Sequence, residues 1–599
     1  MASLNKIYRT DIDGLRAVAV ISVILFHLGF LPNGYLGVDI FFVISGYLIT
    51  GIVYNEVVEE KFSVVKFYER RLRRIFPLVL FTCLAALILG LVFMLPDDLE
   101  NLCQSIIATN FSANNILMYI TSADYWAVKN DYKPLMHTWS LGIEEQFYLL
   151  YPFLFFVLKG NRKKYILSIL ILLSIVSLVL FIVSSNVPAK FYFLHFRFFE
   201  LAVGGICAIY FTTNPISNNA KTQYILLTCL ALTILLLYTN FISSNTVKVL
   251  ITTFLSAAIL VLGGSQYQSS RLYSVIMSNT VMSTIGKISF SLYMWHQLVF
   301  AFARYFLVEE INLPFAIILS LVVVILSFLS YYTIENPFRN RKMMKTKPLL
   351  IIIGVSFILI NGAAFYVYSV GGIVKDVPQL GLTVSNRPSQ MNLFDSKSNI
   401  NIQYNEDVRA LDKPFSETPN KIKVLVLGNS FGRDVANILL ESSFKNDIEV
   451  RYADLTLVES QTEMVTRISK ADYIFFGSTY PNEKMIDQYK LDLRKAIIVG
   501  TKDFGNSNGI HYNKAIEDYH NYRTPMKKGY FEKNKTYKEK WGANYIDLVA
   551  LIADSTGKVL VFTPEGKFLS QDTAHLTKHG AVFFAQLLET RLKNILGLK

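Results

Sequence analysis

The chain has 599 residues, and 52% of them are hydrophobic, with 44 phenylalanines and 34 tyrosines among the aromatic residues. This composition excludes an ordinary soluble protein, and the length exceeds that of one domain. The net charge of +13 does not imply a nucleic-acid partner, because much of it lies in short basic loops between apolar segments, where charge sets membrane topology.

The first long apolar stretch, residues 17–30, contains His27 and directly follows Arg16. Eleven residues at about 100° each return to within roughly 20° of the same helix face, about 16 Å apart along the axis. Ionisable residues inside a membrane helix are costly and usually line an internal polar path. The alternative is an arginine that extends to the membrane surface and an ordinary buried histidine. The pair, together with the motifs described below, favours a functional site.

Apolar segments of about 20 residues recur up to about residue 370 and predict eleven membrane-spanning helices. The predicted spans are residues 15–31, 36–54, 76–95, 143–158, 165–184, 191–211, 223–240, 248–264, 288–307, 312–333 and 349–369. A weaker segment near 103–119 is expected to lie at the membrane surface or to re-enter. No cleavable signal peptide is expected, since the first apolar run has no small-residue cleavage site and leads directly into a second.

Charges in the loops predict the orientation of these spans. The loops after the second, fourth and tenth spans are basic (residues 70–74, 159–164 and 339–347), whereas acidic residues follow the third and the ninth. Because basic loops stay on the cytoplasmic side, the N-terminus is expected in the cytoplasm. An odd number of spans then places everything after residue 370 on the outer side of the membrane.

The remaining chain changes character in two steps. Residues 371–420 are rich in Ser, Asn, Asp and Pro, and we interpret them as a connector. From residue 421 to 599, short apolar runs alternate with helical stretches, which predicts a three-layer α/β domain with a mostly parallel sheet. The predicted strands are Val424–Leu427, Glu449–Tyr452, Tyr473–Phe476 and Ala496–Val499, and the predicted helices include Arg433–Glu441 and Ala581–Ile595.

Two motifs in this outer region suggest a serine nucleophile. The segment Val424–Asp434 ends a strand and turns into a helix at Ser430, which places the hydroxyl at the carboxyl edge of the sheet, near a helix N-terminus. Near the C-terminus, Asp572 precedes His575 by three residues, so that the carboxylate could orient the imidazole and His575 could deprotonate Ser430. An ordinary strand-to-helix turn with Ser or Asn as the N-cap is the alternative.

These motifs resemble those of the SGNH hydrolase-like family, a group of serine esterases with a flavodoxin-like sheet. The resemblance implies that Ser430 is the nucleophile and that Asp572 and His575 complete its triad. Asn429 stands where that family usually has Asp. Gly477, at the end of the third predicted strand, is the nearest candidate for the oxyanion hole.

Four stretches within residues 8–340 resemble the acyltransferase-3 family of membrane proteins. They are Asp13–Ala17 through His27 to Gly37–Tyr47; Phe67–Pro77; His137–Leu141 with Glu144–Phe147; and Ser289–His296, followed by Glu335-Asn336-Pro337. A membrane domain of this kind fused to an SGNH-like domain is similar to the bacterial enzymes that O-acetylate surface glycans.

This second resemblance implies acetyl-CoA as the donor, bound by Arg16, Arg71 and Arg74. Chemistry agrees, because an arginine pair at a cytoplasmic membrane edge can hold phosphates bidentately, although topology-setting charge is the alternative for each arginine. His27, desolvated and near Arg16, is expected to favour its neutral form, which suits a general base or a transient acyl acceptor.

Further residues of these stretches are candidates for supporting roles. They are Trp139, His296, and the carboxylates that could balance charge or relay protons, Asp39, Glu144, Glu145 and Glu335. The alternative for Glu145 and Glu335 is that they are carboxylates at helix ends in the membrane interface. For His296, a packing role and a role in the site are both open. No metal is expected.

The sequence therefore predicts a polytopic α-helical membrane domain (residues 1–340), one further span (341–370), a connector (371–420) and an extracytoplasmic SGNH-like, flavodoxin-like α/β domain (421–599). The catalytic residues are expected to be His27, Ser430, Asp572 and His575. The predicted location is the bacterial inner membrane, with membrane lipid, acetyl-CoA and a glycan as partners and no nucleic acid.

The predicted activity is O-acetyl transfer from cytoplasmic acetyl-CoA to sugar hydroxyls of a surface polysaccharide. Lipopolysaccharide O-antigen is the preferred acceptor, with peptidoglycan or another envelope glycan as the second choice. A transporter with an outer binding domain and an esterase merely anchored by the helices are the alternatives from other functional classes.

Overall fold

The computed structural model divides the chain into two compact units. The first comprises residues 1–92, 101–304 and 310–366, and the second comprises residues 93–100, 305–309 and 367–599. The residues that the structure describes are 8–122, 130–158, 160–214, 216–217, 219–266, 270–306, 311–385, 400–417, 420–455, 457, 460–478, 480–505, 521–526, 529–570 and 574–598.

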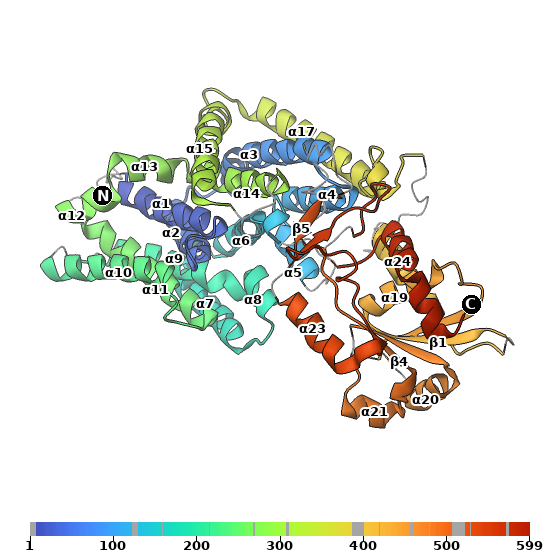
Figure 1. The fold of residues 1–599 in the computed structure, drawn as a ribbon. Helices are drawn as coiled ribbons and strands as arrows, with labels where there is room; N and C mark the ends of the chain where they lie inside the picture. Colours follow the sequence, from blue (N-terminus) through green and yellow to red (C-terminus); the bar gives the residue numbers. More distant parts are fainter. Residues whose placement is uncertain are drawn as a thin grey trace. The chain divides into compact units, whose positions relative to one another are not determined.

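The chain up to residue 369 is almost entirely helical, and each of the eleven predicted spans coincides with a long helix (Figure 1). These helices are α1 (Thr10–His27), α2 (Gly37–Val58), α3 (Val64–Phe93), α6 (Thr138–Val157), α7 (Ile166–Val183), α9 (Leu194–Thr213), α10 (Ala220–Tyr238), α11 (Asn245–Gln266), α14 (Ser289–Phe306), α15 (Leu313–Ser330) and α17 (Thr346–Ser369). The weaker segment near 103–119 falls on two shorter helices, α4 (Pro96–Asn110) and α5 (Asn114–Ser122). The remaining short helices are α8 (Val187–Tyr192), α12 (Arg271–Met277), α13 (Thr280–Lys287) and α16 (Asn336–Arg339).

Eight helices in the described part of the chain are long and apolar enough to cross a membrane. They include α2, α3, α7, α9, α10, α11, α15 and α17. The three predicted spans outside this set, α1, α6 and α14, carry most of the polar residues that the sequence marks as functional, and such residues lower the apolar character of a helix. A multi-pass membrane protein is therefore supported, and the count of eleven spans stays a prediction.

Helices α2 and α9 touch through their backbones at two glycines. A Cβ atom on Gly46 would lie 1.8 Å from the Leu201 carbonyl oxygen, and one on Gly204 would lie 2.1 Å from the Val43 carbonyl oxygen. Small residues permit such close helix approach within membranes. The contact fixes the position of α2, which contributes one wall of the candidate site.

The end of α15 continues through a π-helical turn, Tyr331–Glu335, into α16. Glu335 is buried there, accepts a hydrogen bond from Ser291 Oγ (3.1 Å) and pairs with Arg339 (2.9 Å). Turns of this type are frequent near functional sites. This turn ties α15 to α14, which also contributes residues to the candidate site.

The second unit contains a five-stranded parallel sheet with the strand order β2-β1-β3-β4-β6. Its strands are β1 (Ile422–Gly428), β2 (Ile448–Ala453), β3 (Tyr473–Gly477), β4 (Ala496–Val499) and β6 (Tyr545–Ile546), and a separate antiparallel pair is formed by β5 (Arg523–Pro525) and β7 (Lys558–Leu560). This order is that of flavodoxin-like doubly wound sheets, in which ligands bind at the carboxyl ends of the strands. The four predicted strands are confirmed.

Helices cover both faces of this sheet, so the α/β architecture is confirmed (Figure 1). Alternate strand residues pack against α19 (Ser430–Leu440) and α24 (Lys578–Leu596) on one face, and against α20 (Gln461–Lys470) and α21 (Glu483–Tyr489) on the other. The predicted connector contains α18 (Ile400–Glu406), and α23 (Tyr530–Trp541) precedes β6. The sheet thereby becomes a rigid platform for the residues that follow β1, β3 and β4.

Candidate active sites

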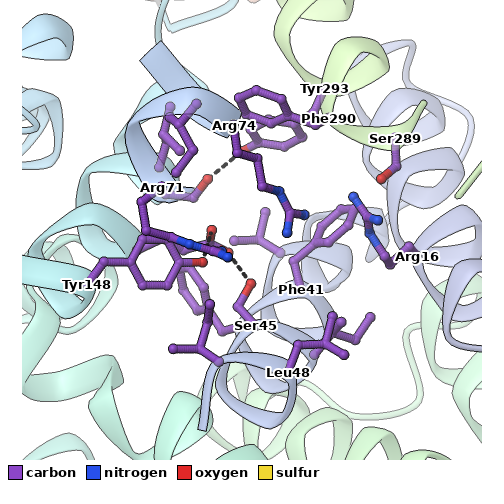
Figure 2. A pocket seen from close by; sticks show the side chains of 18 residues that line it. Arg16, Phe41, Ser45, Leu48, Arg71, Arg74, Tyr148, Ser289, Phe290 and Tyr293 are labelled. Carbon is purple, nitrogen blue, oxygen red and sulfur yellow. Dashed lines mark hydrogen bonds between the residues drawn. The ribbon is translucent and has the colours of Figure 1, made fainter. Parts of the chain in front are cut away.

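A cavity lies inside the first unit, between α1, α2, α3, α6 and α14 (Figure 2). Its polar lining residues are Arg16, Ser45, Arg71, Arg74, Ser140, Glu144, Tyr148, Ser289 and Tyr293. The other lining residues are apolar, among them Phe41, Leu48 and Phe290. A largely apolar cavity with a few convergent polar groups is the usual form of a small-molecule site.

Three arginines point into this cavity from two helices. Arg16 comes from α1, whereas Arg71 and Arg74 lie on one face of α3, and Figure 2 shows the three guanidinium groups converging. Among the described residues, neither Arg71 nor Arg74 donates a hydrogen bond or forms an ion pair. The one ion pair of Arg16 within the described part of the chain is with Asp13, at 4.0 Å. Because enclosed charges without partners are costly, this arrangement favours an anionic ligand.

One carboxylate, that of Glu144 on α6, faces the three guanidinium groups among the described lining residues. It accepts hydrogen bonds from Ser45 Oγ (2.9 Å) and from the Tyr148 hydroxyl (3.1 Å). Arg71 lies 5.7 Å from the ring centroid of Tyr148, which is within cation–π range. The Ser289 hydroxyl is buried and finds no hydrogen-bond partner in the described residues. The cavity therefore has an excess of positive charge and of unused donors.

His27 is the last residue of α1 and is not among the residues that line the cavity. Its ring centroid lies 5.2 Å from that of His296, which in turn lies 5.1 Å from that of His137. The Arg304 guanidinium donates a 2.6 Å hydrogen bond to the His27 carbonyl oxygen. The structure thus separates the predicted Arg16–His27 pair, with Arg16 in the cavity and His27 in a histidine cluster.

Two other predicted residues stabilise helix contacts outside the cavity. Asp39 forms a buried ion pair with Arg197 of α9 (2.7 Å), which also lies 3.1 Å from Glu200. Trp139 packs against Phe191, with ring centroids 4.3 Å apart. Asp39 and Trp139 therefore hold the helices around the cavity in position and do not face a ligand in it.

Two predicted carboxylates are also bonded to the protein itself. Glu145 accepts a hydrogen bond from Ser112, and Glu335 is paired with Arg339 as described above. Neither of them lines the cavity. Of the four carboxylates singled out in the sequence, Glu144 alone lines the described cavity.

In the second unit, Ser430 is the first residue of α19, immediately after β1. His575 Nε2 lies 2.9 Å from Ser430 Oγ, and the Phe431 ring lies 5.4 Å from the imidazole. Asn429 caps the helix by accepting the backbone N–H of Phe431 (3.0 Å). The hydroxyl–imidazole pair required for a serine nucleophile is therefore assembled. Asp572, the third member of the predicted triad, lies outside the described residues.

Gly477 allows the end of β3 to approach α19. A Cβ atom at this position would lie 2.5 Å from the Gly432 Cα atom, so any larger residue would push the helix away. The N–H of the next residue, Ser478, donates to the Val499 carbonyl oxygen (3.2 Å), and Ser478 adopts a left-handed conformation with φ of 53°. The Ser478 amide is thus already engaged within the protein and is not free to bind an oxyanion.

A buried ion pair beneath Ser430 was not predicted from the sequence. Lys502 donates to Asp434 Oδ2, and its ammonium lies 4.3 Å from the Phe431 ring centroid. Asp434 Oδ1 accepts the N–H of Leu576 (3.3 Å) and a hydrogen bond from Asn405 (2.8 Å). Asp434 therefore joins α19 to the segment that carries His575. The only indication of this in the sequence is that Asp434 follows Ser430 by four residues, which places both on one side of a helix.

Comparison with known proteins assigns the family of the first unit. A family model described as an acyltransferase domain matches residues 9–332, which include every residue that lines the cavity and all three clustered histidines. The chain belongs to this acyltransferase family. No solved structure gave a significant match to the acyltransferase chain.

Relatives with assigned names extend the similarity toward the second unit. The O-acetyltransferase OatA of Staphylococcus aureus is 32% identical over 371 residues, which is 56% of this chain and 58% of that protein. The chain thus matches less than two thirds of the length of OatA. The Staphylococcus aureus protein SAS0844, named as a provisional O-acetyltransferase, is 30% identical over 517 residues, 81% of this chain and 82% of its own.

Proposed function

We propose that this protein is a membrane O-acetyltransferase that takes acetyl groups from acetyl-CoA and transfers them to sugar hydroxyls of a surface polysaccharide. The observation that carries the proposal is the convergence of Arg16, Arg71 and Arg74 in one cavity, where the described lining residues include one opposing carboxylate. Family membership and two relatives named for O-acetyl transfer support the same chemistry.

The donor site is assigned to the cavity because of its charge. Acetyl-CoA carries several phosphate charges, and guanidinium groups bind phosphates through paired hydrogen bonds. Arg71 and Arg74 have their donors unused, so a phosphate would supply the partners that they lack. In the predicted topology α3 begins at the cytoplasmic side, where acetyl-CoA is made available.

The acyl step at the membrane is assigned to His27. Its neutral imidazole attacks the thioester carbonyl carbon, so that a C–N bond forms, the C–S bond breaks and the thiolate of CoA leaves. The acetyl group then passes to the outer unit. This order agrees with the predicted topology, in which Arg16 lies nearer the cytoplasm than His27.

The second step is assigned to Ser430 and His575 in an SGNH-like domain. His575 Nε2, 2.9 Å from Ser430 Oγ, removes the serine proton as the hydroxyl attacks the acetyl group, and the acetyl-serine then yields to a sugar hydroxyl. Asp572 is assigned to orient His575. The strand order and the position of Ser430 after β1 support the assignment.

The acceptor is proposed to be a polysaccharide at the bacterial envelope, with lipopolysaccharide O-antigen preferred and peptidoglycan as the other outcome of the test. The names of the relatives state acetyl transfer to oxygen and give no acceptor. We place the protein in the inner membrane, with its N-terminus in the cytoplasm and the second unit outside.

Acetyl-CoA binding to full-length protein in detergent tests the donor site. Arg74→Gln should weaken binding by about 10- to 100-fold, because a hydrogen bond to a charged group contributes about 1.5–3 kcal/mol. Arg70→Gln is the matched control, since Arg70 lies on the same helix but pairs with Glu56 (3.0 Å) outside the cavity. Equal affinities for the wild type and Arg74→Gln would refute the proposed donor site.

A further inference from the structure

Two buried imidazoles, those of His137 and His296, form a contiguous cluster with the partly buried imidazole of His27 in the first unit. His27 ends α1, His137 precedes α6 and His296 lies in α14, so three separate segments converge on one point. The ring centroids of His27 and His296 lie 5.2 Å apart, and those of His296 and His137 lie 5.1 Å apart. His137 and His296 are 1% and 0% exposed.

Nε2 of His296 has no hydrogen-bond partner among the described residues. The His137 ring interacts with the Met294 carbonyl oxygen. Buried polar atoms are nearly always paired, and leaving one unpaired costs roughly 1–3 kcal/mol. A buried imidazole that keeps such an atom unpaired beside two other imidazoles is better explained by chemistry than by packing.

One hydrogen bond determines which nitrogen of His296 is free to act as a base. His296 Nδ1 lies 2.6 Å from the Tyr293 carbonyl oxygen, which can only accept a hydrogen bond. Nδ1 must therefore carry the proton. In the neutral ring, Nε2 then holds an unshared electron pair, and the His296 ring lies 5.2 Å from that of His27 and 5.1 Å from that of His137 between centroids.

The cluster also connects to the cavity. Tyr293 and Ser140 both line the cavity and share a 2.6 Å hydrogen bond, and the Tyr293 hydroxyl donates to the His137 carbonyl oxygen (2.9 Å). The Tyr293 ring packs against His296 at 5.3 Å. His296 thus neighbours both Tyr293 in the cavity wall and His27.

We propose that His296 accepts, through Nε2, the proton that His27 must release when its imidazole is acylated; this rests on the proposed function of His27. Attack by a neutral imidazole on the thioester gives an acylimidazolium, which still carries one N–H. Transfer of this proton to His296 leaves a neutral acylimidazole and an imidazolium. The proton then passes to the departing thiolate, so that free CoA thiol is the product and the charges balance.

The surrounding charge favours this direction of transfer. The Arg304 guanidinium, bonded to the His27 carbonyl oxygen at 2.6 Å, places a positive charge beside His27. A second positive charge on an acylimidazolium at the same place is unfavourable in a low-dielectric interior. His137, whose ring centroid lies 5.1 Å from that of His296, offers a second position for the proton.

The test measures CoA thiol release from acetyl-CoA by full-length protein in lipid nanodiscs, together with acetyl-CoA binding. His296→Asn keeps a donor near the Tyr293 carbonyl but has no group at the Nε2 position. We expect kcat to fall about 100-fold or more, as for loss of a general base, with acetyl-CoA binding unchanged within twofold. Added imidazole should restore part of the rate to His296→Ala, which a packing role would not permit.

His195→Asn is the matched control, because His195 lies in α9 and contacts Phe193 and Phe196 rather than the cluster. A kcat within twofold of wild type in His296→Asn would overturn the proposal. If that variant fails to fold, His296→Gln, which is closer in length, takes its place with the same criterion. Absence of thiol release from the wild type itself would instead refute the proposed function.

Discussion

His575 Nε2 lies 2.9 Å from Ser430 Oγ, although 145 positions separate the two residues in the chain. The fold brings them together because Ser430 begins α19, His575 shortly precedes α24, and these two helices pack beside each other on one face of the sheet. A serine nucleophile and its base are thus positioned by long-range packing rather than by local sequence.

Replacing the serine tests the role of this pair. Ser430→Ala removes the hydroxyl and should reduce acetyl transfer to an acceptor by about 10⁴-fold. Acetyl-CoA binding in the first unit should be unchanged. Ser443→Ala, an exposed serine bonded to Glu589 (2.6 Å), is the control and should retain full transfer. Transfer of labelled acetyl at the wild-type rate by Ser430→Ala would exclude the serine mechanism.

The buried pair Asp434–Lys502 should be a major source of stability for the second unit. Lys502→Met leaves the Asp434 carboxylate buried without its cation, which should cost about 3–5 kcal/mol in the free energy of unfolding. The double variant Asp434→Asn/Lys502→Met should recover most of that loss, because no charge is then left unpaired. Thermal unfolding of the full-length protein measures both, and equal stabilities for the single and double variants would contradict this view.

The second unit should lose stability in mild acid because of His579. Burial, reinforced by Lys567 and Lys578, lowers the pKa of His579 below its ordinary value of 6.5. The unfolded chain therefore binds a proton at His579 more readily than the folded chain does. The contribution of neutral His579 to the free energy of unfolding is complete above pH 6.5 and is lost as the pH falls toward the folded-state pKa.

His579→Gln removes this titration. The variant should show a smaller drop in melting temperature than wild type between about pH 7.5 and 5.5. Parallel losses of melting temperature in the two proteins would show that His579 does not contribute to the acid sensitivity.

The contact between α2 and α9 should tolerate no side chain at Gly46. Gly46→Ala places a methyl group 1.8 Å from the Leu201 carbonyl oxygen, which forces the helices apart, and the yield of folded protein should fall sharply. Gly51→Ala on the same helix is the control, since its Cβ would meet Ala208 at an ordinary 3.7 Å. The ratio of monodisperse to aggregated protein after detergent extraction compares the two, and equal yields would contradict the expectation.

Periodic and strongly apolar segments could be predicted from the sequence. Strands such as Val424–Leu427 are short, fully apolar and bounded by polar residues, and the structure confirms them within one or two positions. Strand β6 was missed because only Tyr545 and Ile546 pair with the sheet, which is too short for a recognisable pattern. Local sequence also located Ser430, because a glycine, an asparagine and a serine mark the turn after β1.

Long-range partners could not be predicted, since they depend on how helices pack. The spacing of Arg16 and His27 predicts that they share a helix face. Which neighbours surround each of them depends on helix packing, which places Arg16 in the cavity and His27 beside His137 and His296. The sequence marks Asp39 as a carboxylate that could balance charge or relay protons, but its partner Arg197 lies 158 residues away in the chain. The residues around Lys502 in the sequence do not indicate its role, because that role depends on the ion pair with Asp434, which only the fold brings about.

The most direct test of the two-step account is mass spectrometry of ester-linked acetyl groups on surface glycans. A deletion strain should be complemented with wild type, His27→Ala or Ser430→Ala, and lipopolysaccharide and peptidoglycan should be analysed separately. The account predicts acetylation of one of these glycans with the wild type and its loss with either variant. Unchanged acetylation with both variants would contradict it.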